Sequence, residues 1–189
     1  LVQVLSSIGN GGYVLILLHY VQSALGFTAL AAGLTLLPFA LGSMAATPLA
    51  ILATRRIGKW AVLLGGMVQA GALTWVLWTI RTAGASLTGW DLTAPLALTG
   101  AGLMTLIMPL TSITLESVPT QDAGAASGTL TTFGQVGMVL GVALAGTMFF
   151  GILQDTANPR EAVTTALWVA IVAYGLAGLA SVIMPDRTK

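Results

Sequence analysis

The feature that most constrains this chain is the distribution of its few charged residues. Charged side chains make up 7% of the sequence and hydrophobic ones 56%, whereas soluble domains are about 25% charged. The charges fall in short clusters that separate apolar runs of about 20 residues or more. A helix of that length crosses the hydrocarbon core of a bilayer. The sequence therefore predicts an all-α integral membrane protein and excludes a soluble globular domain.

The apolar runs predict six transmembrane helices. Residues 1–54 carry no charged side chain and are too long for one crossing, so we divide them within the segment SALGFTALAAG. Six consecutive spans form two sets of three with opposite orientations, which is the arrangement of inverted three-helix repeats in secondary transporters. On span count and length we expect this 3+3 inverted repeat. The predicted spans are 2–24, 29–53, 60–81, 93–116, 126–151 and 162–184.

The basic residues predict how the spans are oriented. Cytoplasmic loops of membrane proteins are enriched in Lys and Arg, and here five basic residues fall on one side of the membrane and two on the other. We therefore expect both ends of residues 1–189 to be cytoplasmic, in a bacterial inner (plasma) membrane. The five are Arg55, Arg56, Lys59, Arg187 and Lys189, and the two are Arg81 and Arg160.

The composition also bears on chemistry. With no cysteine, the chain has no disulfide, no thiolate nucleophile and no cysteine metal site. We find no cluster of His, Asp and Glu, no Ser–His pair and no phosphate-binding loop, so we predict no enzyme activity, no cofactor and no metal. The basic residues are few and lie at span ends, which argues against nucleic acid as a partner. The predicted environment is the lipid bilayer.

The fifth span carries a stripe of small residues. At 100° per residue, Gly134, Gly137, Gly141 and Ala145 fall on one arc, and membrane helices associate through such small residues. We predict that these four pack against another helix, with or without a role in ligand binding. Gln135 lies on the adjoining arc, and an unpaired amide in hydrocarbon costs several kcal/mol. It should therefore face protein, water or a ligand.

Polar stripes on the first, fourth and fifth spans predict a cavity. Asn10 is followed by two glycines near mid-membrane, where irregular backbone must be buried or line a cavity. The alternative is that these side chains only hydrogen-bond neighbouring helices. The predicted lining residues are Gln3, Ser6, Asn10, Tyr13, Thr105, Met108, Ser112, Thr131 and Gln135.

Other polar residues are expected to be peripheral. The third and sixth spans are poor in polar side chains, apart from residues such as Gln69 and Tyr174, and we predict that they are peripheral and face lipid. His19 lies opposite the polar stripe of the first span, near its outer end, and is more consistent with an interfacial residue than with a proton relay. Glu116 is predicted to be a helix-end residue.

Two segments resemble the C-terminal half of major facilitator superfamily transporters, and most of all the fourteen-helix drug:proton antiporters of the multidrug efflux type. They are LPFALGSMAATPLAILATRRIGKWAVLLGG and GLMTLIMPLTSITLESVPTQDAGAASGTLTTFGQVGMVLGVALAG. The loop ATRRIGKW is similar to the family's G-x-x-x-D-R-x-G-R-K pattern. Arg56, Gly58 and Lys59 match it, while Ile51 and Arg55 replace its Gly and Asp. We expect Gly58 to make the turn and the three cations to hold this loop in the cytoplasm.

The resemblance implies a transporter that alternates between two six-helix halves. The first, second, fourth and fifth helices of each half would line the substrate path, and the expected activity is proton-coupled efflux of amphipathic organic compounds. Residues 1–189 would then be a fragment, with the missing N-terminal half as its partner and the carboxylate that couples protons in that half. The alternative is a membrane-embedded structural or assembly subunit without transport activity.

Overall fold

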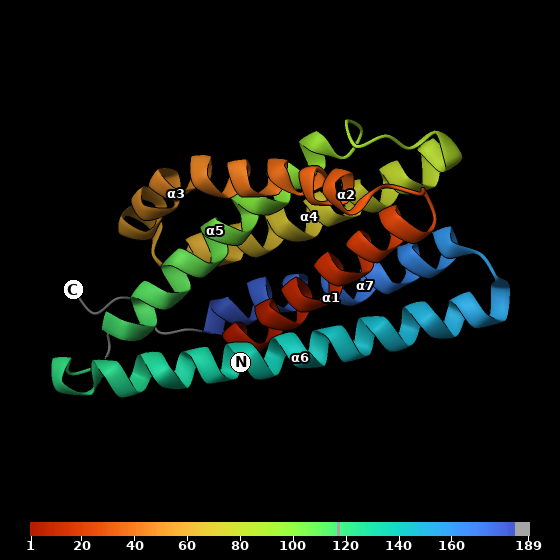
Figure 1. The fold of residues 1–189 in the computed structure, drawn as a ribbon. Helices are drawn as coiled ribbons and strands as arrows, with labels where there is room; N and C mark the ends of the chain where they lie inside the picture. The colour runs from red at the N-terminus through yellow and green to blue at the C-terminus, as the bar shows by residue number, and fades with distance from the viewer. Residues whose placement is uncertain (117, 184–189) are drawn as a thin grey trace.

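The computed structural model describes residues 1–116 and 118–183, so Arg187 and Lys189 of the topology prediction lie outside the described residues. The described chain is helical, with six helices long and apolar enough to cross a membrane (Figure 1). The prediction of an all-α protein with six long apolar helices is confirmed. The helices are α1 (Val2–Ser23), α2 (Ala29–Thr35), α3 (Leu37–Ile57), α4 (Lys59–Ala83), α5 (Thr93–Glu116), α6 (Ala123–Thr156) and α7 (Pro159–Ala180), with short 3-10 turns η1 (Gly84–Ser86), η2 (Thr120–Asp122) and η3 (Ser181–Ile183).

Local sequence explains where the helices end. Gly58 adopts a φ of 53° between α3 and α4, a conformation that favours glycine and makes the sharp reversal at the basic loop. At the start of α7, the Asn158 side chain accepts hydrogen bonds from the backbone N–H groups of Arg160 and Glu161, at 3.2 and 3.4 Å. Pro159 occupies the first turn, where a missing N–H costs nothing.

The second span is divided into two helices. Helix α2 ends at Thr35 and α3 starts at Leu37, with Pro38 in its first turn. Proline has no N–H to donate to the carbonyl four residues earlier, and its ring clashes with that carbonyl, so Pro38 favours a break in the helix here. Pro48, by contrast, lies inside α3 without ending it. The sequence indicates kinks in this span, and the break falls at the first of the two prolines.

Two helices are each packed between two others. Helix α1 lies against α6 and α7, and α5 lies against α3 and α4 (Figure 1). Helices α4 and α7 pack on one another, so the core lies where α1, α4, α5 and α7 meet. The spans formed by α2–α3 and by α6 are the least buried of the six. Two helices of the bundle therefore present long apolar faces outward.

Helices α1 and α6 approach each other backbone to backbone. A methyl group added at Gly141 would collide with the carbonyl oxygen of Ile8, and one added at Gly137 would lie 2.6 Å from the carbonyl oxygen of Val4. At Gly12 the added carbon would lie 3.0 Å from the Ala145 side chain. At Gly137 and Gly141 only glycine permits such an approach, because the nearest obstacle there is backbone that cannot move aside.

The contact between α3 and α5 is built in the same way. A methyl group at Gly42 would strike the carbonyl oxygen of Ala97, and one at Gly100 would strike the carbonyl oxygen of Phe39. The α1–α6 pair and the α3–α5 pair are thus joined by the same type of close backbone contact.

Replacing Gly141 by alanine is expected to separate α1 from α6. The added methyl has no space, and overpacking of this kind costs about 1–3 kcal/mol. Gly146→Ala is the matched control, since nothing lies within 4 Å of a carbon added there and alanine favours the helix. We expect thermal unfolding of the purified protein, followed by tryptophan fluorescence, to start at a lower temperature for Gly141→Ala only. Equal transitions for both variants would contradict the contact.

Candidate substrate cavity

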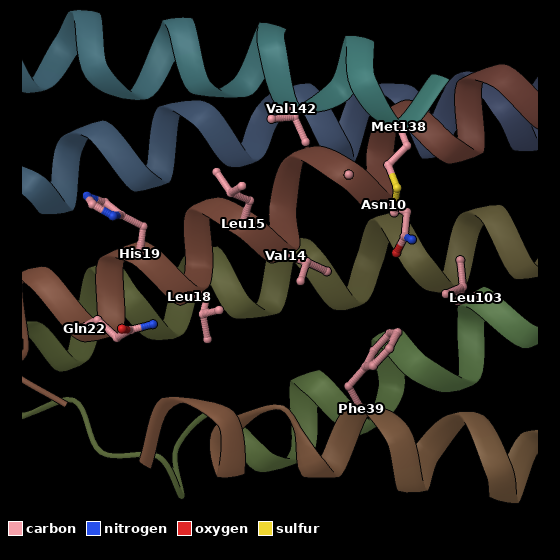
Figure 2. A pocket seen from close by; sticks show the side chains of 11 residues that line it. Asn10, Val14, Leu15, Leu18, His19, Gln22, Phe39, Leu103, Met138 and Val142 are labelled. Atoms are coloured by element: carbon pink, nitrogen blue, oxygen red, sulfur yellow. The ribbon is translucent and has the colours of Figure 1, made fainter. Parts of the chain in front are cut away.

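A cavity of about 710 Å³ lies between α1, α3, α5 and α6 (Figure 2). Its volume is in the range of small-molecule sites, about 300–1,000 Å³. Helix α1 supplies most of the wall, and the close contact at Gly11, where an added methyl would strike the Met138 carbonyl, joins α1 to α6 beside it. The lining residues are Asn10, Gly11, Val14, Leu15, Leu18, His19, Gln22, Phe39, Leu103, Met138 and Val142.

The polar groups of this cavity all come from α1. They are Asn10, His19 and Gln22, and the described residues that complete the wall are apolar or glycine. The side-chain oxygen of Asn10 is buried and has no hydrogen-bond partner within the described chain. A buried acceptor without a partner costs about 1–3 kcal/mol, so this oxygen favours a ligand or water that donates a hydrogen bond to it.

His19 belongs to the same cavity as Asn10. Its imidazole packs edge to face against Phe149 and Phe150 of α6, with ring centroids 5.5 Å apart in both pairs. The two phenylalanine rings are themselves perpendicular, at 87°. The helical-wheel argument placed His19 opposite the polar stripe, but the cavity follows α1 over several turns and reaches both residues (Figure 2). Sequence reasoning predicted Asn10 as a lining residue but not His19, because Phe149 and Phe150 lie far along the chain from it.

The other predicted lining residues are distributed over several places. Met108 and Ser112 line a second pocket of about 380 Å³ between the ends of α3 and α5, and Gln3 lines another of about 340 Å³. Thr105 is half-buried, and its hydroxyl donates to the Ala101 carbonyl at 2.8 Å. The structure therefore does not bring the predicted set together around one cavity.

Four more of those residues differ in burial. Ser6 and Tyr13 are buried, at 2% and 1% exposed, on the side of α1 that faces the bundle. Thr131 and Gln135 are exposed on α6. The predicted packing residues Gly137, Gly141 and Ala145 are buried in the α1–α6 contact, while Gly134 is half-buried and lies near the Gln3 amide.

The second pocket brings opposite charges to one end of the bundle. Arg55, at the end of α3, and Glu116, at the end of α5, both line it. The Ser112 hydroxyl donates to a Glu116 carboxylate oxygen at 2.9 Å. At the start of α4 the Lys59 ammonium lies 5.9 Å from the centre of the Trp60 ring. This end of the bundle therefore carries the basic loop together with an acidic helix end.

A buried polar cluster occupies the centre of the bundle. Tyr13, Gln69, Thr99 and Tyr174 come from α1, α4, α5 and α7, and none is more than 1% exposed. The Gln69 amide lies beside the Tyr174 hydroxyl, and the Tyr13 hydroxyl lies beside Thr99. Neither pair has hydrogen-bond geometry in the described structure. Four polar side chains are thus buried at the centre of the bundle.

Glycines of α1 and α5 make room for this cluster. A carbon added at Gly9 would lie 2.5 Å from the Tyr174 ring, and one added at Gly102 would lie 2.9 Å from the Gln69 side-chain oxygen. Helices α4 and α7, expected to face lipid, therefore have two different faces. Their outer faces expose tryptophans, including Trp78 at 61%, and their inner faces bury polar side chains.

The cluster predicts energetic coupling between Gln69 and Tyr174. Gln69→Leu leaves the Tyr174 hydroxyl without its polar neighbour and should lower the free energy of unfolding by about 1–3 kcal/mol. Adding Tyr174→Phe should cost less than the two single changes combined, by about 1 kcal/mol. Thr74→Val, on the exposed side of α4, should be additive with Tyr174→Phe. Additive effects in both double variants would show that Gln69 and Tyr174 do not interact.

Among the relatives that comparison with known proteins gives are three bacterial proteins. The chain is 36% identical over 162 residues to a probable actinorhodin transporter of Streptomyces coelicolor, an alignment that covers 84% of this chain and 28% of the relative. It is 29% identical over 151 residues to multidrug resistance protein Stp of Mycobacterium tuberculosis, covering 79% and 27%. It is 28% identical over 165 residues to the putative multidrug resistance protein MdtD of Cronobacter sakazakii, covering 85% and 34%.

The chain spans about a third or less of the length of these relatives. No protein-family model matches it. The relatives bear the names of a transporter and of multidrug resistance proteins, and none of these three names describes an enzyme.

Proposed function

We propose, from the similarity to these transporters, that this chain belongs to the multidrug efflux transporters of the major facilitator superfamily and forms the C-terminal six-helix half of a fourteen-helix protein. The complete protein exports amphipathic organic compounds by alternating access, driven by protons. The observation that carries this proposal is the cavity between α1, α3, α5 and α6, which is apolar except for a few polar groups that include the unpartnered Asn10 oxygen. It is formed by the four helices that the resemblance assigns to the substrate path.

Helix pairing supports the proposal of a 3+3 inverted repeat. Exchanging α1 with α5, α3 with α6 and α4 with α7 converts the α1–α6 and α1–α7 contacts into the α5–α3 and α5–α4 contacts. The same exchange leaves the α4–α7 contact unchanged. Buried positions follow the same exchange: Ser6 and Thr99, and Gly9 and Gly102, are equally far apart in the sequence. Both hydroxyls donate to the carbonyl three residues earlier.

The positions of the charged residues support a proposed orientation. Arg55, Arg56 and Lys59 lie at the end of the bundle where α1 begins and α7 ends (Figure 1). We place this end in the cytoplasm, because basic loops stay on that side. Among the described spans, acidic side chains occur only at helix ends and in connections. The proposal therefore assigns the coupling carboxylate to the N-terminal half.

Asn10 and the exposed residues of α6 have different roles in this proposal. Asn10 binds a donor group of the substrate inside the cavity, while Thr131 and Gln135 face the second half of the transporter. The remaining predicted lining residues stay predictions. Alternating access requires that a half move as a unit, and the backbone contacts at Gly100 and Gly141 support such movement.

Efflux of ethidium from cells that express the complete polypeptide tests this function. Asn10→Leu should lower kcat/KM by about tenfold through the loss of a buried hydrogen bond to the substrate, and Gln135→Leu should lower it by removing a polar contact with the second half of the transporter. Gln154→Leu, at the far end of α6, is the matched control and should leave efflux unchanged. Unchanged efflux in both test variants would refute the assignment of these residues. Efflux no faster than in cells with an empty vector would instead favour the assembly-subunit alternative.

A further inference from the structure

His19 is the described residue of the cavity wall that can change its charge near neutral pH. Asn10 and Gln22 are neutral amides, and the wall residues from α3, α5 and α6 are apolar. The groups packed directly on the imidazole are the rings of Phe149 and Phe150. The charged groups Asp155, near the end of α6, and Arg160, in the first turn of α7, are outside the described lining of the cavity. A proton on His19 therefore places a positive charge in a cavity without a described counter-charge.

The side chains around His19 determine where its positive charge lies. Phe149 and Phe150 hold the imidazole from α6 while α1 holds its backbone, so the ring stays at the cavity wall. The apolar wall screens charge poorly, and like charges in such a site repel strongly. A cationic ligand in this volume and a proton on His19 would therefore oppose each other, whereas an anionic ligand and the proton would favour each other.

We propose that His19 is a proton-responsive specificity residue of this cavity. Protonated, it excludes cationic amphiphiles and favours anionic ones, while the neutral imidazole admits cations. The inference rests on the proposed function in so far as the cavity receives amphipathic compounds. It assigns to this half of the protein a titratable group of its own, separate from the coupling carboxylate.

Exclusion of a cation by protonated His19 can be measured as a change in the Kd of that cation. Histidine is the side chain that gains and loses a proton between about pH 5 and 8. When the protonated form does not bind a cation, the apparent Kd for that cation rises as the inverse of the fraction of the protein in which this residue is neutral. A ligand of constant negative charge should show no such rise.

Ligand binding to the complete protein in lipid nanodiscs tests the proposal. Ethidium serves as the cation and 8-anilinonaphthalene-1-sulfonate as the anion, because both keep their charge between pH 5.5 and 8.0. In the unmodified protein the Kd for ethidium should be higher at pH 5.5 than at pH 8.0, and the Kd for the anion should be equal or lower at pH 5.5. His19→Gln should remove the contribution of this residue and give tight ethidium binding at both pH values.

A permanently charged variant completes the comparison. His19→Arg should bind ethidium weakly and the anion well at both pH values. The same pH dependence in the unmodified protein and in His19→Gln, or no ethidium binding at any pH, overturns the proposal. The failure of the proposed function looks different: ethidium binding would depend on His19 and pH, but cells expressing the protein would not export ethidium. Export with a pH dependence unaltered by His19→Gln overturns the role of His19 alone.

Discussion

Direct backbone contact at glycine positions determines how these helices are arranged. In lipid the burial of apolar side chains does not drive helices together, so close packing and polar contacts have to do so. Gly137 and Gly141 let α6 rest on the backbone of α1, and Gly42 and Gly100 do the same for α3 and α5. With each outer helix fixed to an inner one, the space that remains between the two pairs becomes the cavity along α1. The same residues that would weaken a helix in water thus define the position of the site.

Helix α1 separates its polar residues between two environments. Ser6 and Tyr13 face the centre of the bundle, where Tyr13 meets Thr99 near Gln69 and Tyr174. Asn10 and His19 face the cavity, which is otherwise apolar. A buried polar group without a partner is costly, and among these residues the description applies to atoms of Tyr13, Gln69, Tyr174 and Asn10. The polar groups at the centre therefore favour a rigid bundle that keeps them together, and the Asn10 oxygen favours a ligand that donates a hydrogen bond to it.

The periodicity and composition of the sequence predict the six spans and suggest close packing along the glycine stripe of α6. They do so because bilayer thickness and helix pitch are fixed lengths that a single sequence can reveal. Three features depend on contacts between distant segments and could not be predicted: His19 beside Phe149 and Phe150, the burial of Gln69, and the separation of Met108 from Asn10. A helical wheel gives the face of a residue but not the neighbour that covers it. For this reason the sequence does not reveal that α4 and α7, which are predicted to face lipid, also bury polar side chains.

Disulfide trapping between α1 and α6 tests the arrangement most directly, and these residues contain no cysteine of their own. A carbon added at Gly12 lies 3.0 Å from the Ala145 side chain, close to the spacing of about 3.5–4.5 Å between the Cβ atoms of a disulfide. With Gly12→Cys and Ala145→Cys in an otherwise cysteine-free transporter, mild oxidation in native membranes should cross-link α1 to α6 nearly completely. Gly12→Cys with Gly146→Cys, which points into open space, should remain reduced. Equal cross-linking of the two pairs, or none in the first, would contradict the packing on which the cavity depends.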